Sequence, residues 1–409
     1  MKRIIVILFL LFQSLHAFLN TDNNYEKQLS VLKNFDIPAN FLKDSVFISM
    51  KEDLEVYKTK HFLQDLENGD RFVPGLQKMM REAGIPVEFL YLAMTESSFS
   101  PNASSSARAS GLWQFIPSTG KLYGLVDNRF IDERKDPVKS TQAAIAYLKR
   151  LHGMFDKWYV AALAYNCGEG TVTKAIAKAG TDDINVLLDE SKKYLPKESR
   201  LYIRKILMMS FISNSTGFML DHESEYLLNR ANNATFIKVE VNSGTLLQDV
   251  ANSIGISLKE LKAYNPQLKQ LFTPPYGNQS YLYIPQDRQI VFSQKFDRNK
   301  SGGKYDIYVA KKGDSLLKIA KKYGISSDAI MQINGLKNTS IKPKSELIIP
   351  LSTQASTPAS SASYTIKAGD TMELVAKQYN ISVAALMKAN HKKETFVKVG
   401  ESIVIPKSY

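Results

Sequence analysis

The chain has 409 residues, and its 44% hydrophobic and 10% aromatic content excludes a disordered protein. This length is too great for one compact core and predicts two to four domains. The net charge of +13 favours an anionic partner, such as a cell-wall polymer, an anionic lipid surface or nucleic acid, and charge alone does not choose among them.

The N-terminus has the layout of a signal peptide. Residues 1–3 are charged, residues 4–12 form an apolar run too short to span a bilayer, and residues 14–17 (S-L-H-A) offer a small-residue cleavage site. We therefore predict that residues 1–17 are a signal peptide that directs export to the periplasm or cell envelope. Export leads us to expect no nucleic-acid partner.

Cys167 is the only cysteine of the chain. It excludes a disulfide within the chain, so stability must come from packed cores. Because no cysteine lies beside the cleavage site, we expect no lipid anchor. No later stretch is long and apolar enough to cross a bilayer, so we expect no transmembrane segment in the mature chain.

Helical patterns run from about residue 25 to residue 220. We expect one helix to end at Gly84, a second to span residues 86–99, and a third to start at Asp136-Pro137. "KWYVAALAYN" and "SRLYIRKILMMSFIS" predict two more, and no convincing strand alternation accompanies them. We divide this region into an N-terminal helical segment at 18–70, with no role beyond packing, and a helical domain at 71–220.

Internal repeats follow from about residue 236. Residues 308–336 and 364–391 correspond at a spacing of 56 residues, as between Gly313 and Gly369, and a weaker copy covers 239–266. Each copy predicts a strand, two helices and a strand. The predicted modules span 236–287, 304–351 and 363–407, and a Ser/Thr/Ala/Pro-rich linker at 352–363 separates the last two.

The repeats resemble the LysM module. The resemblance lies in the G-D-S/T-L/M turn, the "IAKKYGIS" and "VAKQYNIS" helices, Asn334, Asn390 and the closing Ile-Pro. It implies binding of glycans that contain N-acetylglucosamine, whereas a structural repeat without a ligand is the alternative. The first copy has Thr245 where the others have aspartate, so glycan binding by this degenerate module stays open.

The stretch "AMTESSF" places Glu96 at the end of an apolar helix. Apolar surroundings raise the pKa of a carboxyl group, and a glutamic acid that stays protonated near neutral pH can act as a general acid. The alternative is an exposed glutamate at a helix end, which is the commoner case for a single residue.

Three later motifs favour catalysis: G-L-W-Q-F at 111–115, A-Y-N-C-G at 164–168 and L-P-K-E-S-R-L-Y at 195–202. In this order after E-S, they resemble the goose-lysozyme-like lytic transglycosylases over about residues 71–215. With the repeats behind them, the layout resembles the D-type membrane-bound lytic transglycosylases. The resemblance implies a mostly α-helical lysozyme-like catalytic domain followed by small α+β (βααβ) LysM repeats, acting on peptidoglycan.

The resemblance also implies a role for each matched residue. Taken singly, each of these polar side chains would more simply pack or cap. Cys167 stands where relatives carry a small residue, and no histidine lies in its motif to make it a nucleophile. The implied roles are acid/base for Glu96, fixing of carboxylate and sugar for Ser97, lining of the glycan groove for Gln114, hydrogen bonding to substrate for Tyr165 and Asn166, and approach to the catalytic carboxylate for Tyr202.

An ordinary glycoside hydrolase needs two carboxylates. The sequence has no acidic residue between Glu96 and Asp127, and we expect Asp132, Glu133 and Asp136 to cap helices and pair on the surface. A lytic transglycosylase needs only one, because the 6-hydroxyl of the cleaved N-acetylmuramic acid attacks its own C1 and gives a 1,6-anhydro ring. We predict this reaction, with no cofactor and no metal. The alternatives are a goose-type lysozyme and a non-catalytic peptidoglycan-binding protein.

Overall fold

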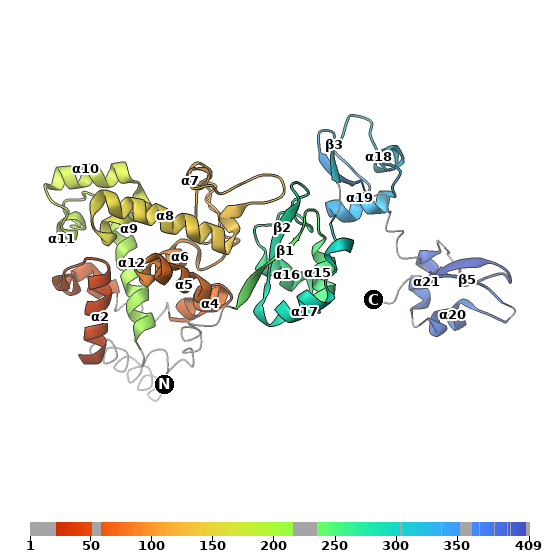
Figure 1. Ribbon diagram of the computed structural model, residues 1–409, viewed down its shortest axis with the longest axis horizontal. Coiled ribbons are helices and arrows are strands. Elements are labelled where there is room, and N and C mark those ends of the chain that lie inside the picture. Colours follow the sequence, from red (N-terminus) through yellow and green to blue (C-terminus); the bar gives the residue numbers. More distant parts are fainter. Residues whose placement is uncertain are drawn as a thin grey trace, which may run out of the picture. The chain divides into compact units, whose positions relative to one another are not determined.

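A computed structural model gives the structure of the chain (Figure 1). It describes residues 22–50, 59–215, 235–302, 305–336, 338–351, 362–367, 369–379, 381–390, 392 and 394–405. The predicted signal peptide at 1–17 and residues 352–361 of the predicted linker lie outside this part. The chain divides into two compact units, residues 1–302 and 303–409.

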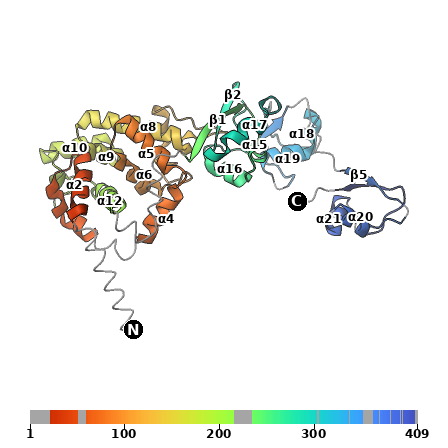
Figure 2. The same ribbon diagram turned by 60° about the horizontal axis from the view of Figure 1, so that its bottom comes forward.

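The first unit begins with a helical domain in which no strand occurs among the described residues 22–215. Its long helix α12 packs against α2, α6 and α9 and lies in the middle of the other helices (Figure 2). The helices are α2 (Asp22–Asn34), α4 (Thr59–Gly69), α5 (Val73–Ala83), α6 (Leu90–Ser97), α7 (Pro117–Leu122), α8 (Pro137–Phe155), α9 (Trp158–Cys167), α10 (Glu169–Ala179), α11 (Ile184–Leu187) and α12 (Lys197–Asn214), with 3-10 turns η1 (Ala39–Lys43), η2 (Val87–Phe89) and η3 (Glu133–Lys135).

The N-terminal segment shares the core of this helical domain. Phe35, Phe41 and Phe47 are fully buried in the same apolar cluster as the helices around α12. Phe47 packs edge-on against Phe211 of α12, with ring centroids 5.5 Å apart. The described residues before α4 therefore act as one wall of the core.

Local signals set the helix ends much as the sequence predicts. Gly84 ends α5 in the left-handed conformation, with φ of +67°. Asp136 caps α8 by accepting hydrogen bonds from the backbone of Val138 and Lys139. The helix expected at 86–99 is shorter: it starts with the 3-10 turn η2 and ends at Ser97, because Ser98 and Phe99 both have positive φ.

The first repeat belongs to the same unit. Strands β1 (Phe236–Asn242) and β2 (Gln279–Pro285) pair antiparallel, and α15 (Leu247–Ile254) and α16 (Leu258–Tyr264) pack beside them. The 3-10 turns η4 (Gln286–Arg288) and η5 (Arg298–Lys300) and helix α17 (Gln289–Lys295) follow. Phe236 and Tyr283 enter the core of the helical domain, so this module is built onto that domain.

The second unit holds the other two repeats. In the second repeat of the chain, β3 (Tyr305–Val309) pairs antiparallel with β4 (Glu346–Pro350). Helices α18 (Leu316–Tyr323) and α19 (Ser327–Asn334) lie between these strands in the chain. In the third repeat of the chain, β5 (Ala362–Thr365) pairs antiparallel with β6 (Ser402–Ile405). Helices α20 (Met372–Gln378) and α21 (Val383–Ala389) lie between these strands in the chain. The predicted βααβ order is therefore confirmed in all three repeats.

An asparagine at the end of the second helix fixes each repeat. The amide of Asn334 donates to the backbone oxygen of Ile348 at 2.8 Å and accepts from its nitrogen at 2.7 Å. Asn390 does the same with Val404, and Asn265 with Tyr283. The side chain thus completes the backbone hydrogen bonding of the second strand. None of the described helices is long and apolar enough to cross a membrane.

Candidate active site

Glu96 lies in the last turn of α6. Among the residues that precede it, Leu90, Leu92 and Ala93 have no exposed surface. The two left-handed residues Ser98 and Phe99, with φ of +51° and +55°, end the helix after Ser97. The carboxylate is therefore half-buried at the point where an apolar helix meets a loop.

Tyr202 of α12 contacts this carboxylate. Its hydroxyl donates a hydrogen bond of 2.5 Å to Oε1 of Glu96. Burial raises the pKa of Glu96 above its usual range, and the bond from Tyr202 opposes part of that rise. Burial and the Glu96 charge hold the pKa of Tyr202 far above its own usual range, so the hydroxyl stays a donor.

Glu198 is a residue near this site that the sequence analysis did not predict. Its charge adds to the rise in the pKa of Glu96. Glu198 is exposed at the start of α12, four residues before Tyr202 and so one helical turn away. The four-residue spacing in "LPKESRLY" could have indicated that Glu198 lies on the same side of the helix as Tyr202. The charge of a second carboxylate therefore contributes to the raised pKa of Glu96, although it comes from a segment that was not considered for this role.

Tyr165 joins two of the predicted motifs. Its hydroxyl donates to the backbone oxygen of Trp113 at 2.8 Å, which ties A-Y-N to G-L-W-Q-F. Burial, followed by the charge of Glu96, holds the pKa of Tyr165 well above its usual range. Tyr165, Tyr202 and Glu96 are thus brought into one electrostatic neighbourhood.

Ser97 and Gln114 brace the loop between α6 and α7. The hydroxyl of Ser97 is buried, 2.9 Å from the backbone oxygens of both Ala93 and Leu112. The amide nitrogen of Gln114 donates to Gly111 at 2.8 Å and to Ala103 at 3.3 Å. Gln114 has a φ of +46° and remains half-buried.

Gly111 explains how closely this loop can pack. Its φ is +83°, and a Cβ built on it would lie 1.8 Å from the backbone oxygen of Arg134. Only glycine fits such an approach. The glycine of G-L-W-Q-F therefore seats the loop against the segment before α8.

Asn166 and Cys167 end α9 near the start of α12. Oδ1 of Asn166 accepts a 2.7 Å hydrogen bond from the hydroxyl of Ser199. Cys167 is half-buried, its sulfur is 3.2 Å from the backbone oxygen of Leu163, and burial raises the pKa of its thiol. A raised thiol pKa disfavours the thiolate that a cysteine nucleophile needs.

Comparison with known proteins places the chain in a family. Residues 76–188 match the model of the transglycosylase SLT domain, residues 235–301 that of the lytic transglycosylase MltD LysM-like domain, and residues 308–350 and 364–406 that of the LysM domain. Membrane-bound lytic murein transglycosylase D of Escherichia coli (strain K12) is 31% identical over 366 residues, which are 83% of this chain and 78% of that protein. The chain belongs to this family.

Two further similarities are more limited. N-acetylmuramoyl-L-alanine amidase sle1 of Staphylococcus aureus (strain USA300) is 30% identical over 176 residues, which are 40% of this chain and 51% of the amidase. Among solved structures, the lytic transglycosylase Slt of Pseudomonas aeruginosa, as an inactive mutant, is 21% identical over 36% of this chain and 24% of its own, with a TM-score of 0.29. The matches to the family models and to the relative from Escherichia coli confirm the predicted resemblance, and the helical domain and βααβ repeats confirm the predicted fold class.

An aromatic group extends the SLT domain site beyond the predicted residues. The ring of Tyr147 lies 5.1 Å from that of Tyr165 and 5.1 Å from that of Tyr123, all three half-buried. Arg150 donates to the hydroxyl of Tyr123 at 3.0 Å and pairs with Glu169. Partly exposed rings in a row suit the apolar faces of sugars.

The three carboxylates before α8 have structural roles in the SLT domain. Asp132 caps η3 and pairs with Arg134 at 2.9 Å, and Glu133 pairs with Lys139. Capping by Asp132 and Asp136 agrees with the prediction. The predicted pairing on the surface is wrong for all three, because Asp132, Glu133 and Asp136 are only 4%, 5% and 0% exposed.

Asp136 is covered by the LysM-like module. It has no exposed surface and accepts hydrogen bonds from the hydroxyls of Tyr281 at 2.6 Å and Tyr283 at 3.0 Å. The two tyrosines stand in strand β2, so a buried carboxylate of the SLT domain anchors the module. None of the three carboxylates hydrogen-bonds to Glu96.

Proposed function

We propose that Glu96 is the one acid/base of a lytic transglycosylation of peptidoglycan. Protonated Glu96 gives its proton to the β-1,4 glycosidic oxygen between N-acetylmuramic acid and N-acetylglucosamine, and the bond from C1 to that oxygen breaks. The Glu96 carboxylate then takes the proton of the 6-hydroxyl of the same muramic acid residue. The 6-oxygen bonds to C1, which gives the 1,6-anhydro ring, restores protonated Glu96 and consumes no water.

The contact between Glu96 and Tyr202 carries this proposal. Burial favours the protonated carboxyl that the first step needs, and the hydroxyl of Tyr202 stabilises the carboxylate that the second step needs. Because the bond is made to Oε1, the other oxygen of Glu96 can carry the proton. Because burial raises the pKa of Glu96 and the hydrogen bond from Tyr202 lowers it, the same carboxyl group can act first as acid and then as base.

The other predicted residues orient the sugar. The amide nitrogen of Asn166 and the carbonyl oxygen of Gln114 are left for substrate, because Oδ1 of Asn166 and Nε2 of Gln114 are the atoms that bond within the protein. Ser97 acts through the loop, which its hydroxyl joins to α6. Tyr165 holds the A-Y-N motif at that loop and presents its ring beside Tyr147.

Hydrolysis is the second candidate, and Glu198 is the observation that favours it. An exposed carboxylate whose charge reaches Glu96 could activate water. Mass spectrometry of digested peptidoglycan separates the two reactions, since transglycosylation gives 1,6-anhydro products and hydrolysis gives reducing ends. Glu96→Gln should lower the rate by about two to four orders of magnitude. Wild-type rates in that variant would remove Glu96 from the mechanism.

The two LysM modules of the second unit hold the enzyme on glycan containing N-acetylglucosamine. Their tethering raises the local concentration of polymer at the SLT domain. The degenerate module at 236–287 differs: Tyr308 and Tyr364 donate to Asp314 and Asp370, at 2.8 and 2.7 Å, while the corresponding residues of that module are Val239 and Thr245. We propose that this module acts as a structural part of the SLT domain and does not tether the enzyme to glycan by itself.

Export by residues 1–17 places this activity in the periplasm, beside the polymer. The relative from Escherichia coli is named as a membrane-bound protein. Fractionation of cells that produce the full chain, with and without residues 1–17, tests this location. Activity that stays in the cytoplasm with the full chain would contradict it.

A further inference from the structure

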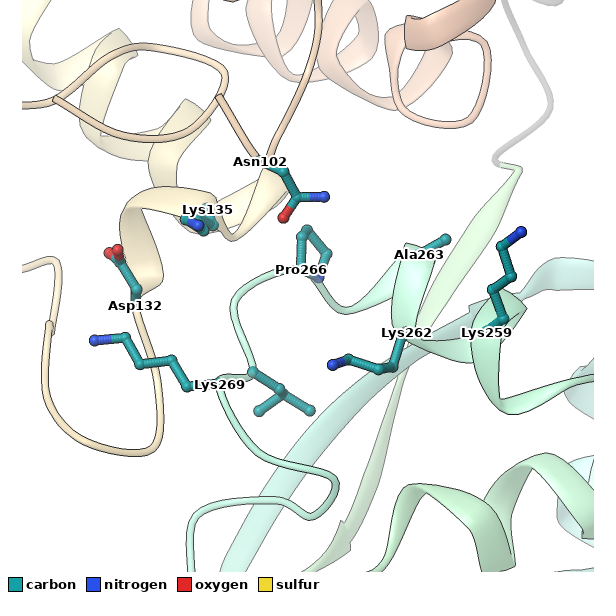
Figure 3. Close-up of a pocket in the computed structure, with 9 residues that line it drawn as sticks. Asn102, Asp132, Lys135, Lys259, Lys262, Ala263, Pro266 and Lys269 are labelled. Carbon is teal, nitrogen blue, oxygen red and sulfur yellow. The ribbon is translucent and has the colours of Figure 1, made fainter. Parts of the chain in front are cut away.

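A basic cavity lies at the junction between the SLT domain and the LysM-like module. Its volume is about 400 Å³, within the range of small-ligand sites. Both sides are seen in Figure 3, with the carboxamide of Asn102 above Pro266. The polar wall is formed by Asn102, Asp132 and Lys135 from the SLT domain and by Lys259, Lys262 and Lys269 from the module.

Backbone contacts fix the two walls against each other. The nitrogen of Asp132 donates to the oxygen of Gln267 at 2.8 Å, and the nitrogen of Lys269 donates to Phe130 at 2.9 Å. Ile131 packs in the apolar core of the module. The cavity is therefore a built part of the first unit, together with the anchoring of Asp136 described above.

Two of the charged groups on the wall are already neutralised. Lys269 pairs with Asp127 at 2.6 Å, and Asp132 is held by Arg134 at 2.9 Å. These pairs remove one positive and one negative charge from the wall. The net charge of the wall is therefore set by the remaining lysines.

Three ammonium groups remain without a counterion. Lys135, Lys259 and Lys262 make no side-chain hydrogen bond or ion pair within the described part of the chain. Lys135 lines the cavity from the SLT domain, and Lys259 and Lys262 line it from α16 of the module. In Figure 3, the ammonium group of Lys262 points across the cavity toward the SLT domain, whereas that of Lys259 points upward at its edge. Three unpaired positive charges on a fixed concave surface attract an anion with more than one negative group.

The floor of the cavity indicates what kind of anion fits. Leu268, which is 4% exposed, lines it with Ala263 and Pro266. An apolar floor under a cationic rim suits a short peptide with aliphatic side chains and free carboxylates better than a bare phosphate. Asn102 adds a neutral amide beside that rim.

We propose that this cavity binds the carboxylates of the stem peptide on the peptidoglycan strand that the SLT domain cleaves. This rests on the proposed function. Asn102 precedes Ala103, whose backbone oxygen accepts from Gln114 in the predicted glycan-lining motif. A peptide held in the cavity therefore lies against the same loop that borders the active site. Strands with peptides are preferred over bare glycan.

The test compares peptide-bearing strands with strands stripped of peptides, using the full chain. The variant Lys135→Gln, Lys259→Gln and Lys262→Gln should lose about five- to twentyfold in kcat/KM on peptide-bearing strands, mainly through KM, and little on stripped strands. The matched control replaces Lys174, Lys192 and Lys205 with Gln. These lysines are exposed elsewhere on the SLT domain, and the net charge changes equally.

Equal losses on both substrates, or no loss on either, would overturn the proposal. A variant that keeps its preference for peptide strands but loses binding to vesicles with anionic phospholipid would assign the cavity to lipid instead. Binding of the free stem peptide, against the same peptide with amidated carboxylates, is measured by calorimetry without catalysis. If the wild type cleaved neither polymer, the proposed function would fail, and this binding measurement would still decide on the cavity.

Discussion

The hydroxyl of Tyr202 donates a 2.5 Å hydrogen bond to the carboxylate of Glu96, across 106 residues of sequence. It links the first and last of the four motifs through two helices that pack directly, α6 and α12. The bond opposes the effect of burial on the pKa of Glu96. It therefore couples the fold of the SLT domain to the protonation state of the proposed acid.

Replacing Tyr202 with Phe should change both the rate and its pH dependence. Without the donor, the pKa of Glu96 rises further, so the alkaline limb of kcat/KM moves to higher pH. The rate at the optimum falls by roughly ten- to a hundredfold, because a hydrogen bond to a charged group is lost. Tyr159→Phe is the control, since its hydroxyl donates to Asp182 elsewhere in the domain. An unshifted limb would contradict the pairing.

Replacing Glu198 with Gln should have the opposite effect on pH. The negative charge of Glu198 raises the pKa of Glu96, so its removal lowers that pKa and moves the alkaline limb to lower pH. The products stay 1,6-anhydro muropeptides. Glu82→Gln removes the same charge from an exposed side chain of α5 that is not among the groups raising the pKa of Glu96, so it should leave the limb in place. Loss of reducing-end products in the Glu198 variant would instead identify a hydrolase.

Glu96, Tyr202 and Glu198 show which features of this site could be predicted from the sequence. The resemblance carried by the ordered motifs implied that Tyr202 approaches the carboxylate of Glu96, and the structure places the two in contact. Their hydrogen bond depends on how α6 packs on α12, which no local pattern encodes. The absence of acids close to Glu96 in sequence was a weaker guide, since the charge of Glu198, from a later motif, also raises the pKa of Glu96.

The docking of the LysM-like module was also beyond the sequence pattern. Strand β2 reads Q-S-Y-L-Y-I-P and is buried from Leu282 to Pro285, which is the mark of a strand covered on both faces. That pattern indicates that another part of the protein covers the strand, but it does not identify the residues that do so. The partner is Asp136, 145 residues before Tyr281, for which the sequence predicted a helix cap and pairing on the surface.

The double variant Tyr281→Phe and Tyr283→Phe tests this anchor. It leaves the buried carboxylate of Asp136 without its hydroxyl donors, at a cost of about 1–3 kcal/mol in the free energy of unfolding. The cost is larger at pH 7 than at pH 4, because lost donors raise the pKa of Asp136 and the protonated form avoids the penalty at low pH. Denaturant unfolding measures this. Tyr276→Phe, at the exposed edge of the same junction, is the control.

The asparagines of the second unit allow the tether to be removed without touching the SLT domain. Asn334→Ala and Asn390→Ala each delete a side chain that bonds to the second strand of its module. A module this small has little stability to lose, so about 1–3 kcal/mol should unfold a large fraction of it. Binding of the double variant to purified sacculi should weaken about tenfold or more, while cleavage of short soluble glycans is unchanged. Asn338→Ala alters only an exposed turn of the same module and serves as the control. Unchanged sacculus binding together with demonstrated unfolding of both modules would mean that glycan is held elsewhere in the chain.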